Sequence, residues 1–283
     1  MDLLHKNETL KDGSVWNFTG KLDYVDQWFL MKTPLPMIFL TASYLSFVLK
    51  LGPKYMESRK PFKLTTVITV YNILQVAYSC ALLYIGHNLI STYGLLSSSC
   101  LMEAEDTKWK VTTSIYYYFF AKVTELMDTI FFVLRKKYNQ VTFLHIYHHS
   151  LMMWGSWVSL KYEPSYGTIF LGTLNSFVHI IMYTYYALSA FPDLSKYLWW
   201  KKYITMMQLI QFMCIIVHAA ASQFFSGCPP SYTLLMTIML NAALFIYLFG
   251  QFYINSYRNT QKLSEKKILS DNCTQRKIDT KVD

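Results

Sequence analysis

The segment FLHIYHHS, residues 143–150, places three of the chain's seven histidines within an otherwise apolar run. On an α-helix, His145, His148 and His149 are three and four residues apart, so we expect their imidazoles to share one face. Three ionisable rings are costly to bury in an apolar helix unless they have partners or a function. The segment therefore predicts a site inside a bundle of apolar helices.

The composition indicates a protein that crosses a membrane several times. Of the 283 residues, 53% are hydrophobic and only 15% are charged, whereas a soluble domain has about 25% charged residues. A membrane-spanning helix needs about 20 mostly apolar residues. Seven apolar segments of roughly that length follow one another: 35–50, 66–87, 113–134, 141–160, 166–190, 203–225 and 233–255. We predict an all-α polytopic membrane protein with seven transmembrane helices.

The positions of the basic residues predict the orientation in the membrane. The net charge of +9 does not indicate nucleic-acid binding, because most of the 26 Lys and Arg residues fall in short loops between apolar segments. They concentrate in the loops 50–65, 135–140 and 191–202 and after residue 257. The positive-inside rule places this side in the cytosol. The N-terminus is then expected in the lumen and the C-terminus in the cytosol.

This orientation divides the chain into three regions. We expect a lumenal N-terminal segment over residues 1–30 and a seven-helix transmembrane domain over residues 31–257. Residues 258–283 are polar and charged, which is typical of a disordered basic tail.

Sequons and cysteines agree with a lumenal N-terminal side. Asn7 and Asn17 each begin an Asn-x-Thr sequon, and we expect both to carry glycans. Cys100 and Cys228 fall in two predicted lumenal loops. Because the lumen is oxidising, we expect these two cysteines to form a disulfide; the alternative is a pair of free surface thiols.

Polar residues recur at membrane depth in four of the predicted helices. Counted from the cytosolic boundaries, Asp128 lies about 10 Å inside, the clustered histidines about 8–14 Å, and Gln208 and Gln211 about 8–12 Å. The overlapping depths predict a polar chamber open to the cytosol, continued by a narrow apolar tunnel. The polar residues are Lys122, Glu125, Asp128, Thr129, His145, His148, His149, Asn175, His179, Thr205, Gln208 and Gln211. Such a shape suits an amphiphile with a charged head and a long tail.

The histidine cluster has three interpretations. A membrane di-iron desaturase or hydroxylase uses several histidine boxes, but His5 and His87 lie far from the cluster. Structural histidines bonded between helices are the second interpretation. We favour the third, in which the histidines act as nucleophile and acid–base groups and Asp128 orients one ring.

Other polar residues are candidates for substrate contact. Lys122 and Glu125 are also explained by a buried ion pair that joins helices, which is the simpler interpretation. Basic residues at the cytosolic mouth could bind phosphates. The candidates are Lys122, Glu125, Tyr183, Tyr186, Gln208, Gln211, Lys201, Lys202 and Arg258.

A seven-helix receptor or transporter would share this topology. The third predicted helix does not end in Asp-Arg-Tyr, and the seventh holds no Asn-Pro-x-x-Tyr. A module that only binds a ligand would not need a face of histidines beside Asp128. An enzyme is therefore the favoured class.

Four motifs, in order, resemble those of the very-long-chain fatty acid elongase family. They are KVTELMDT from residue 122, HIYHH from 145, HIIMYTYY from 179 and TMMQLIQ from 205. The resemblance covers roughly residues 25–260. It implies a protein of the endoplasmic reticulum in which six helices form a barrel around a substrate tunnel and the first helix lies outside.

The resemblance also implies a reaction, the condensing step of fatty acid elongation. A long-chain acyl-CoA and malonyl-CoA would give a 3-oxoacyl-CoA two carbons longer, with loss of CoA and carbon dioxide. No metal or redox cofactor is implied, and the ketoreductase, dehydratase and enoyl reductase of the cycle would be separate partners. Membrane lipid is the expected surrounding, and homo-oligomer formation stays open.

The catalytic roles expected from this chemistry fall on five residues. His148 would attack the acyl thioester, and His179 or His149 would polarise the thioester or move protons. Asp128 and His145 would orient the reacting rings. The assignment among the histidines and the preference for chain length stay open.

Overall fold

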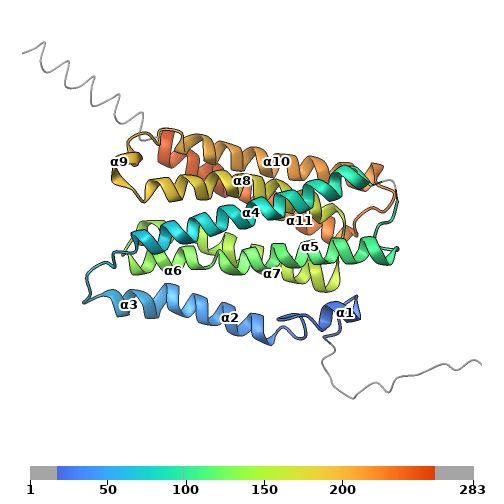
Figure 1. The fold of residues 1–283 in the computed structure, drawn as a ribbon, viewed down its shortest axis with the longest axis horizontal. Helices are drawn as coiled ribbons and strands as arrows, with labels where there is room; N and C mark the ends of the chain where they lie inside the picture. Colours follow the sequence, from blue (N-terminus) through green and yellow to red (C-terminus); the bar gives the residue numbers. More distant parts are fainter. Residues whose placement is uncertain (1–17, 98, 259–283) are drawn as a thin grey trace, which may run out of the picture.

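The computed structural model describes residues 18–97 and 99–258, and every regular element in these ranges is a helix (Figure 1). The long helices are α4 (Thr65–Tyr93), α5 (Glu105–Thr124), α7 (Phe143–Tyr162), α8 (Gly167–Ser189), α10 (Lys201–Phe225) and α11 (Tyr232–Tyr253). The first apolar segment forms α2 (Leu35–Ser46), which continues through η1 (Phe47–Leu51) into α3 (Gly52–Met56). The remaining elements are α1 (Asp23–Asp26), α6 (Met127–Leu134), η2 (Tyr138–Gln140), α9 (Pro192–Ser195) and η3 (Ile254–Arg258).

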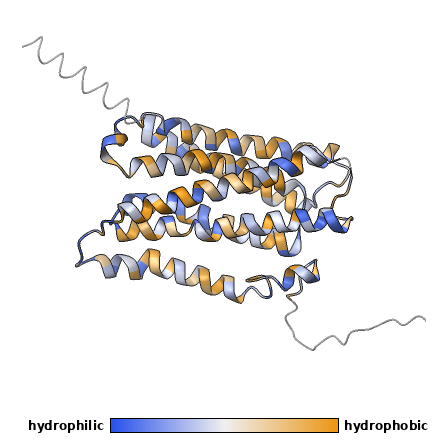
Figure 2. Cartoon of the chain, in the orientation of Figure 1, coloured by the Kyte–Doolittle hydropathy of each residue, from blue (hydrophilic) through white to orange (hydrophobic). Residues whose placement is uncertain are grey.

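Four helical stretches are long and apolar enough to cross a membrane. They are Leu35–Met56, Thr65–Tyr93, Lys201–Phe225 and Tyr232–Tyr257. Figure 2 shows hydrophobic residues along the length of the bundle, with hydrophilic residues gathered near its two ends. The chain is an α-helical membrane protein that crosses the bilayer more than once.

The third predicted segment differs from the structure at both its start and its middle. The helix begins at Glu105, eight residues before the apolar run, because the acidic residues Glu105 and Asp106 in its first turn favour the positive end of the helix dipole. It then ends at Thr124, and α6 begins at Met127. At this break the Leu126 amide donates to Val123 O at 3.3 Å, a tighter turn than the α-helix. The expected single helix over 113–134 is therefore two helices.

The long helices contact one another in a closed sequence of neighbours. α4 packs against α5 and α8, α5 against α7, α7 against α11, α11 against α10, and α10 against α8, while α5 also touches α8. α2 lies at the edge of the bundle, below the green helices in Figure 1. The closest approach is that of α4 and α8, since a Cβ on Gly86 would lie 1.9 Å from Thr173 Oγ1. Only glycine fits at that position.

The two ends of the bundle have different chemistry. At one end a disulfide joins Cys100 and Cys228, whose Cα atoms are 4.7 Å apart; we call this the disulfide end. The other end carries the loops 57–64, 135–142 and 190–200, and we call it the basic end. There the Phe62 amide donates to Leu134 O at 3.1 Å, which ties α6 to the loop after α3.

Residues 18–32 are fastened to the last turn of α7 at the disulfide end. Lys161 is fully buried, and its Nζ donates to Asp26 Oδ1 at 2.5 Å and to Met31 O at 2.6 Å. The Lys21 amide donates in return to Lys161 O at 2.8 Å. Asn7 and Asn17, and the tail over residues 259–283, lie outside the described residues.

Candidate active site

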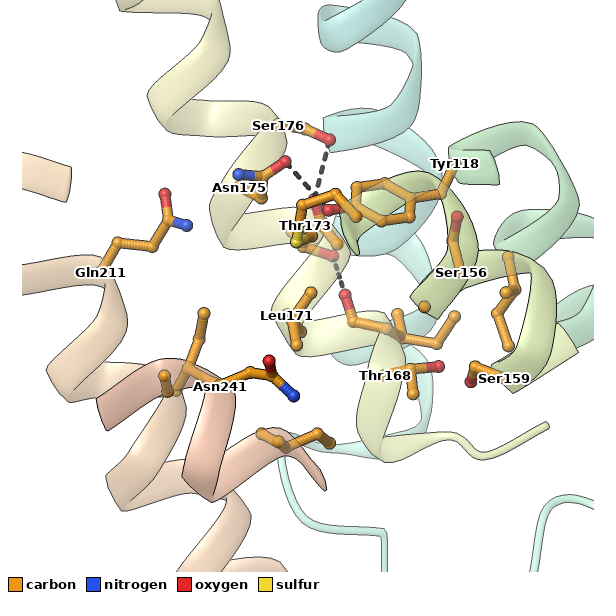
Figure 3. Close-up of a pocket in the computed structure, with 18 of the residues that line it drawn as sticks. Tyr118, Ser156, Ser159, Thr168, Leu171, Thr173, Asn175, Ser176, Gln211 and Asn241 are labelled. Atoms are coloured by element: carbon orange, nitrogen blue, oxygen red, sulfur yellow. Dashed lines mark hydrogen bonds between the residues drawn. The ribbon is translucent and has the colours of Figure 1, made fainter. Parts of the chain in front are cut away.

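A cavity of about 180 Å³ lies between six helices. Leu82, Tyr118, His148, Asn175, Gln211 and Ala242 line it, one from each of α4, α5, α7, α8, α10 and α11. Figure 3 shows these walls converging, with polar side chains spaced along an otherwise apolar lining. Along α7 the lining reaches from His148 to Ser159, about 16 Å at 1.5 Å per residue. The cavity is therefore elongated along the bundle and extends from His148 toward the disulfide end.

The cavity continues toward the disulfide end in a second, smaller hollow. Five residues line both spaces: Thr168, Leu171, Ile215, Leu234 and Ile238. His218 also lines the smaller hollow, where its Nε2 lies 3.2 Å from Leu95 O and its ring stacks on Phe170 at 4.2 Å between centroids. His218, held by these two contacts, therefore forms part of the wall of the smaller hollow.

His148 is the member of the histidine cluster that lines the cavity. Its ring packs edge-on against Phe245, with centroids 5.0 Å apart, and lies 6.1 Å from Phe249. Consecutive residues on a helix point about 100° apart, so His149 cannot share this direction. The expected common face is therefore only partly correct: His148 faces the cavity and α11, and the other two rings face elsewhere.

His145 and His149 form a pair, in which His145 is turned toward α6. Their ring centroids are 4.3 Å apart, and His145 Nε2 lies 2.9 Å from Thr129 Oγ1. Thr129 in turn contacts the Tyr44 hydroxyl at 2.8 Å. These contacts hold His145 away from the cavity, so a role in orienting His149 fits its position better than direct contact with a substrate.

A buried network joins α5 to α8 beside the cavity. Lys122 Nζ donates to Glu125 Oε1 at 2.7 Å and to Oε2 at 3.0 Å. Glu125 Oε1 also lies 3.1 Å from Nδ1 of His179. All three side chains are nearly inaccessible to solvent. The network gives His179 a fixed ring orientation, with a carboxylate on Nδ1.

Asn175 completes this network one turn before His179 on α8. Its Oδ1 accepts a hydrogen bond from Lys122 Nζ at 2.7 Å and another from the Tyr118 hydroxyl at 3.0 Å. The Lys122 ammonium also lies over the Tyr118 ring, 4.7 Å from its centroid. Because two donors meet on one oxygen, the orientation of this amide is fixed.

Asp128 does not orient a histidine, which corrects the expectation from the sequence. It is buried, and its Oδ2 accepts a hydrogen bond from the Tyr183 hydroxyl at 2.8 Å. The carboxylate that reaches an imidazole is that of Glu125. The reason is the break between α5 and α6, since α6 begins only one residue before Asp128 and the spacing of one continuous helix does not apply.

Comparison with known proteins now decides the family. The sequence profile of the ELO: GNS1/SUR4 family matches residues 29–265, more than four fifths of the chain. The chain belongs to the ELO: GNS1/SUR4 family.

Members of this family with established names are similar over most of the chain. A very long chain fatty acid elongase of Aedes aegypti is 39% identical over 239 residues, which are 83% of this chain and 66% of that relative. Very long chain fatty acid elongase 4 of Homo sapiens is 39% identical over 251 residues, 87% of this chain and 78% of the relative. Very long chain fatty acid elongase 7 of Drosophila melanogaster is 41% identical over 232 residues, which are 81% of this chain and 70% of that relative. The chain thus spans about two thirds to four fifths of the length of these relatives.

In this ELO family member the two glutamines of α10 have different surroundings. Gln211 is buried and lines the cavity, and its Oε1 has no hydrogen-bond partner among the described residues. Gln208 instead directs Nε2 to the sulfur of Met182 at 3.8 Å. Of the two, only Gln211 therefore lines the same cavity as His148.

Three further predicted residues, Tyr186, Lys201 and Lys202, are not part of the cavity lining. Tyr186 packs edge-on against Tyr183 at 6.0 Å between centroids. Lys201 and Lys202 are exposed at the start of α10 on the basic end. Arg258 ends η3 and is the last residue that the structure describes. The side chains of Tyr186, Lys201 and Lys202 do not contribute to the lining of the cavity.

Sequence reasoning did not single out Tyr118, and it placed Thr129 and Asn175 only among the polar residues of the predicted chamber. Asn175 was recognisable only as a polar residue one helical turn from His179. Tyr118 lies four residues before Lys122, a spacing that puts both on one face of α5. Among the described residues, no group of three or more His, Cys, Asp or Glu side chains is arranged to hold a metal ion.

Proposed function

We propose that the chain catalyses the condensing step of fatty acid elongation, joining a long-chain acyl-CoA to malonyl-CoA to give a 3-oxoacyl-CoA two carbons longer. It would thus be an acyltransferase of the 3-oxoacyl-CoA synthase type. One observation carries the proposal: a histidine, His148, lies at one end of an elongated, mostly apolar cavity, beside buried polar side chains. Membership of a family whose named relatives are very long chain fatty acid elongases supports it.

The first half of the reaction transfers the acyl group to the protein. A ring nitrogen of His148 attacks the thioester carbonyl carbon, and the new C–N bond replaces the C–S bond. CoA leaves as a thiolate and is protonated, while the imidazole proton passes to a neighbouring base, His149 or His179. The product is an acyl-imidazole, which is a reactive acyl donor. The acyl chain extends through the cavity toward the disulfide end.

The second half of the reaction forms the new carbon–carbon bond. Malonyl-CoA loses carbon dioxide, and the resulting enolate attacks the acyl carbon held on His148. The C–N bond then breaks, and the ring nitrogen of His148 takes back its proton from the neighbouring base, which restores the imidazole. In sum, acyl-CoA, malonyl-CoA and one proton give 3-oxoacyl-CoA, carbon dioxide and CoA. No metal or redox cofactor takes part in the proposed scheme.

The proposal includes seven transmembrane helices, six of which form a barrel around the substrate tunnel. In support, the cavity lining comes from α4, α5, α7, α8, α10 and α11, and these six helices contact one another in a closed sequence. α2 contributes no residue to the lining. The first helix would therefore lie outside the barrel, facing lipid.

The proposed location is the endoplasmic reticulum membrane, with the N-terminus in the lumen. A disulfide between Cys100 and Cys228 fits an oxidising lumen at that end. The Lys and Arg residues at the basic end fit the cytosol. The CoA groups would then meet Lys201 and Lys202 at the cytosolic mouth. The ketoreductase, dehydratase and enoyl reductase that complete the cycle would act as partners on the same membrane.

A condensation assay tests the proposed function. The purified protein is given long-chain acyl-CoA and radiolabelled malonyl-CoA, and the product is identified as 3-oxoacyl-CoA. We expect product with the wild-type protein and a loss of at least about 1,000-fold with His148→Ala, because the nucleophile is removed. Absence of 3-oxoacyl-CoA over a range of chain lengths would refute the proposal.

A further inference from the structure

The side-chain amide of Asn175 has a fixed orientation, and it takes no part in the two half-reactions proposed above. Asn175 is buried at 3% exposure and lines the same cavity as His148. Both hydrogen bonds that the structure gives its side chain end on Oδ1, from Lys122 and from Tyr118. The nitrogen Nδ2 is therefore the part of the amide that is free to meet a substrate.

The orientation of the amide follows from its donors. An ammonium and a phenol hydroxyl both donate, so the atom that they share must be the acceptor oxygen and not the NH₂ group. Figure 3 shows the result: the oxygen of Asn175 points to Tyr118, and the nitrogen points the other way, toward Gln211 across the cavity. An exchange of the two atoms would set NH₂ against two donors.

The surrounding charges strengthen Nδ2–H as a donor. The Lys122 cation lies 2.7 Å from Oδ1 and draws electron density toward that oxygen. Hydrogen bonds that share a group polarise one another in a medium of low dielectric. Glu125 balances the charge of Lys122 at 2.7 and 3.0 Å, so the network needs no counter-ion from solvent.

From this geometry we propose that Asn175 is a catalytic hydrogen-bond donor, whose Nδ2–H binds the carbonyl oxygen of the acyl thioester while His148 attacks the carbonyl carbon. This inference rests on the proposed function. As the C–N bond forms, negative charge collects on the carbonyl oxygen, and a donor held in advance stabilises it. The hydrogen stays on Nδ2 throughout, and no proton is transferred. Lys122 and Tyr118 are positioning residues that act through Asn175.

Gln211 is a second amide that lines the cavity of His148, but it is held less firmly. Its Oε1 is buried without a partner among the described residues, so no donor fixes the amide from the oxygen side. A donor that must first reorganise stabilises a developing charge less than one already in place. Asn175 is therefore the stronger candidate for the oxyanion donor.

The test measures the first half of the reaction alone. Purified protein is mixed with a saturating long-chain acyl-CoA in the absence of malonyl-CoA, and the single-turnover release of CoA thiol is followed. For Asn175→Ala we expect the rate constant of release to fall about 100- to 1,000-fold, with the acyl-CoA concentration at half-saturation changed by less than about threefold. For Tyr118→Phe we expect a smaller fall, because Lys122 still holds Oδ1. Asn139→Ala, at an exposed asparagine of η2, is the matched control and should release CoA at the wild-type rate.

A spectroscopic measurement separates donation from a structural role. An acyl-CoA labelled with a heavy isotope at the carbonyl carbon is bound to His148→Ala, which cannot react, and its C=O stretch is recorded by infrared difference spectroscopy. The stretch should lie at lower frequency in His148→Ala than in His148→Ala/Asn175→Ala, since a hydrogen bond weakens the C=O bond.

Two results would overturn the role of Asn175. One is release of CoA by Asn175→Ala at close to the wild-type rate, whether or not condensation is lost. The other is an unchanged C=O stretch in the two His148→Ala proteins. Failure of the wild-type protein itself to release CoA and to form product would instead refute the proposed function, so the two failures are distinguishable.

Discussion

Glu125 Oε1 lies 3.1 Å from Nδ1 of His179, and the two side chains join the end of α5 to α8 in the interior of the bundle. The same carboxylate holds Lys122. A carboxylate on Nδ1 fixes the imidazole in the tautomer with hydrogen on Nδ1 and leaves Nε2 as an acceptor. Glu125 therefore sets the state in which His179 can take up a proton.

The first prediction concerns the free energy of unfolding. Glu125→Gln removes the negative charge but leaves Lys122 buried, which should cost about 3–5 kcal/mol because an uncompensated buried charge remains. Thermal unfolding followed by tryptophan fluorescence measures the change. Glu105→Gln is the matched control, since Glu105 forms the same spacing of ion pair with Lys108 but is 81% exposed; it should change stability by less than about 1 kcal/mol.

The pair of Lys122 and Glu125 can also be removed together. Lys122→Met/Glu125→Met should be less destabilised than Glu125→Gln, because no buried charge is left alone. The free energies of unfolding of Lys122→Met and Glu125→Met are measured as well. If the double variant lost as much stability as the sum of these two single variants, or more, the result would contradict the buried ion pair.

A second prediction follows from the contact between Asp128 and Tyr183. Tyr183→Phe removes the hydroxyl that donates to Asp128 Oδ2 at 2.8 Å and should cost about 1–3 kcal/mol, because a buried acceptor loses its donor. Tyr186→Phe serves as the control, since the Tyr186 hydroxyl makes no such contact. Equal unfolding temperatures for the two variants would show that the bond to Asp128 contributes nothing.

The third prediction concerns the length of the acyl chain. Gly155 lines the cavity, and a Cβ placed on it would meet no atom within 4 Å. Gly155→Leu should therefore fold, fill part of the tunnel and shorten the longest product by at least one elongation cycle, as measured by mass analysis of the acyl products. Gly250→Leu makes the same change at an equally open glycine of α11 that is outside the lining. The account would be wrong if both variants gave the wild-type product distribution.

A fourth prediction concerns the disulfide end. Cys100 and Cys228 are 128 residues apart in the chain, and closing so long a loop should stabilise the folded state by about 2–5 kcal/mol. Cys100→Ser/Cys228→Ser should therefore unfold at a lower temperature under non-reducing conditions. Cys80→Ser/Cys214→Ser, at two exposed cysteines that are free in the described part of the chain, is the control and should unfold like the wild type. A reducing agent should lower the unfolding temperature of the wild type but not that of the Cys100→Ser/Cys228→Ser variant.

The helical fold could be predicted from the sequence because each apolar run is long enough to form a helix, and each run lies mostly within helices of the structure. The break at Glu125 and Leu126 could not, since no proline or glycine between residues 105 and 134 marks it. The partner of Asp128 was missed for the same reason. A sequence gives the spacing of residues on an unbroken helix but not the rotation that follows an interruption.

The sequence identified most residues of the candidate site but not the direction in which each side chain points. The HIYHH motif identified the three histidines, but only the packing of α7 against α11 shows that His148 faces the cavity while His145 turns to Thr129. The role of Asn175 could not be predicted from the sequence, because it depends on contacts between helices. Lys122 and Tyr118 of α5 fix the orientation of its amide, and the packing of the other helices forms the cavity that the amide lines. Such relations depend on tertiary packing, which local spacing does not encode.

The central claim is that His148 carries the acyl group, and intact-protein mass spectrometry tests it most directly. The purified protein is incubated with a long-chain acyl-CoA alone, quenched, weighed and digested to locate any added acyl group. We predict one added acyl group on the peptide that contains His148 and none on the His148→Ala protein. An acyl group found on a different residue, or a His148→Ala protein that still forms 3-oxoacyl-CoA at the wild-type rate, would contradict the account.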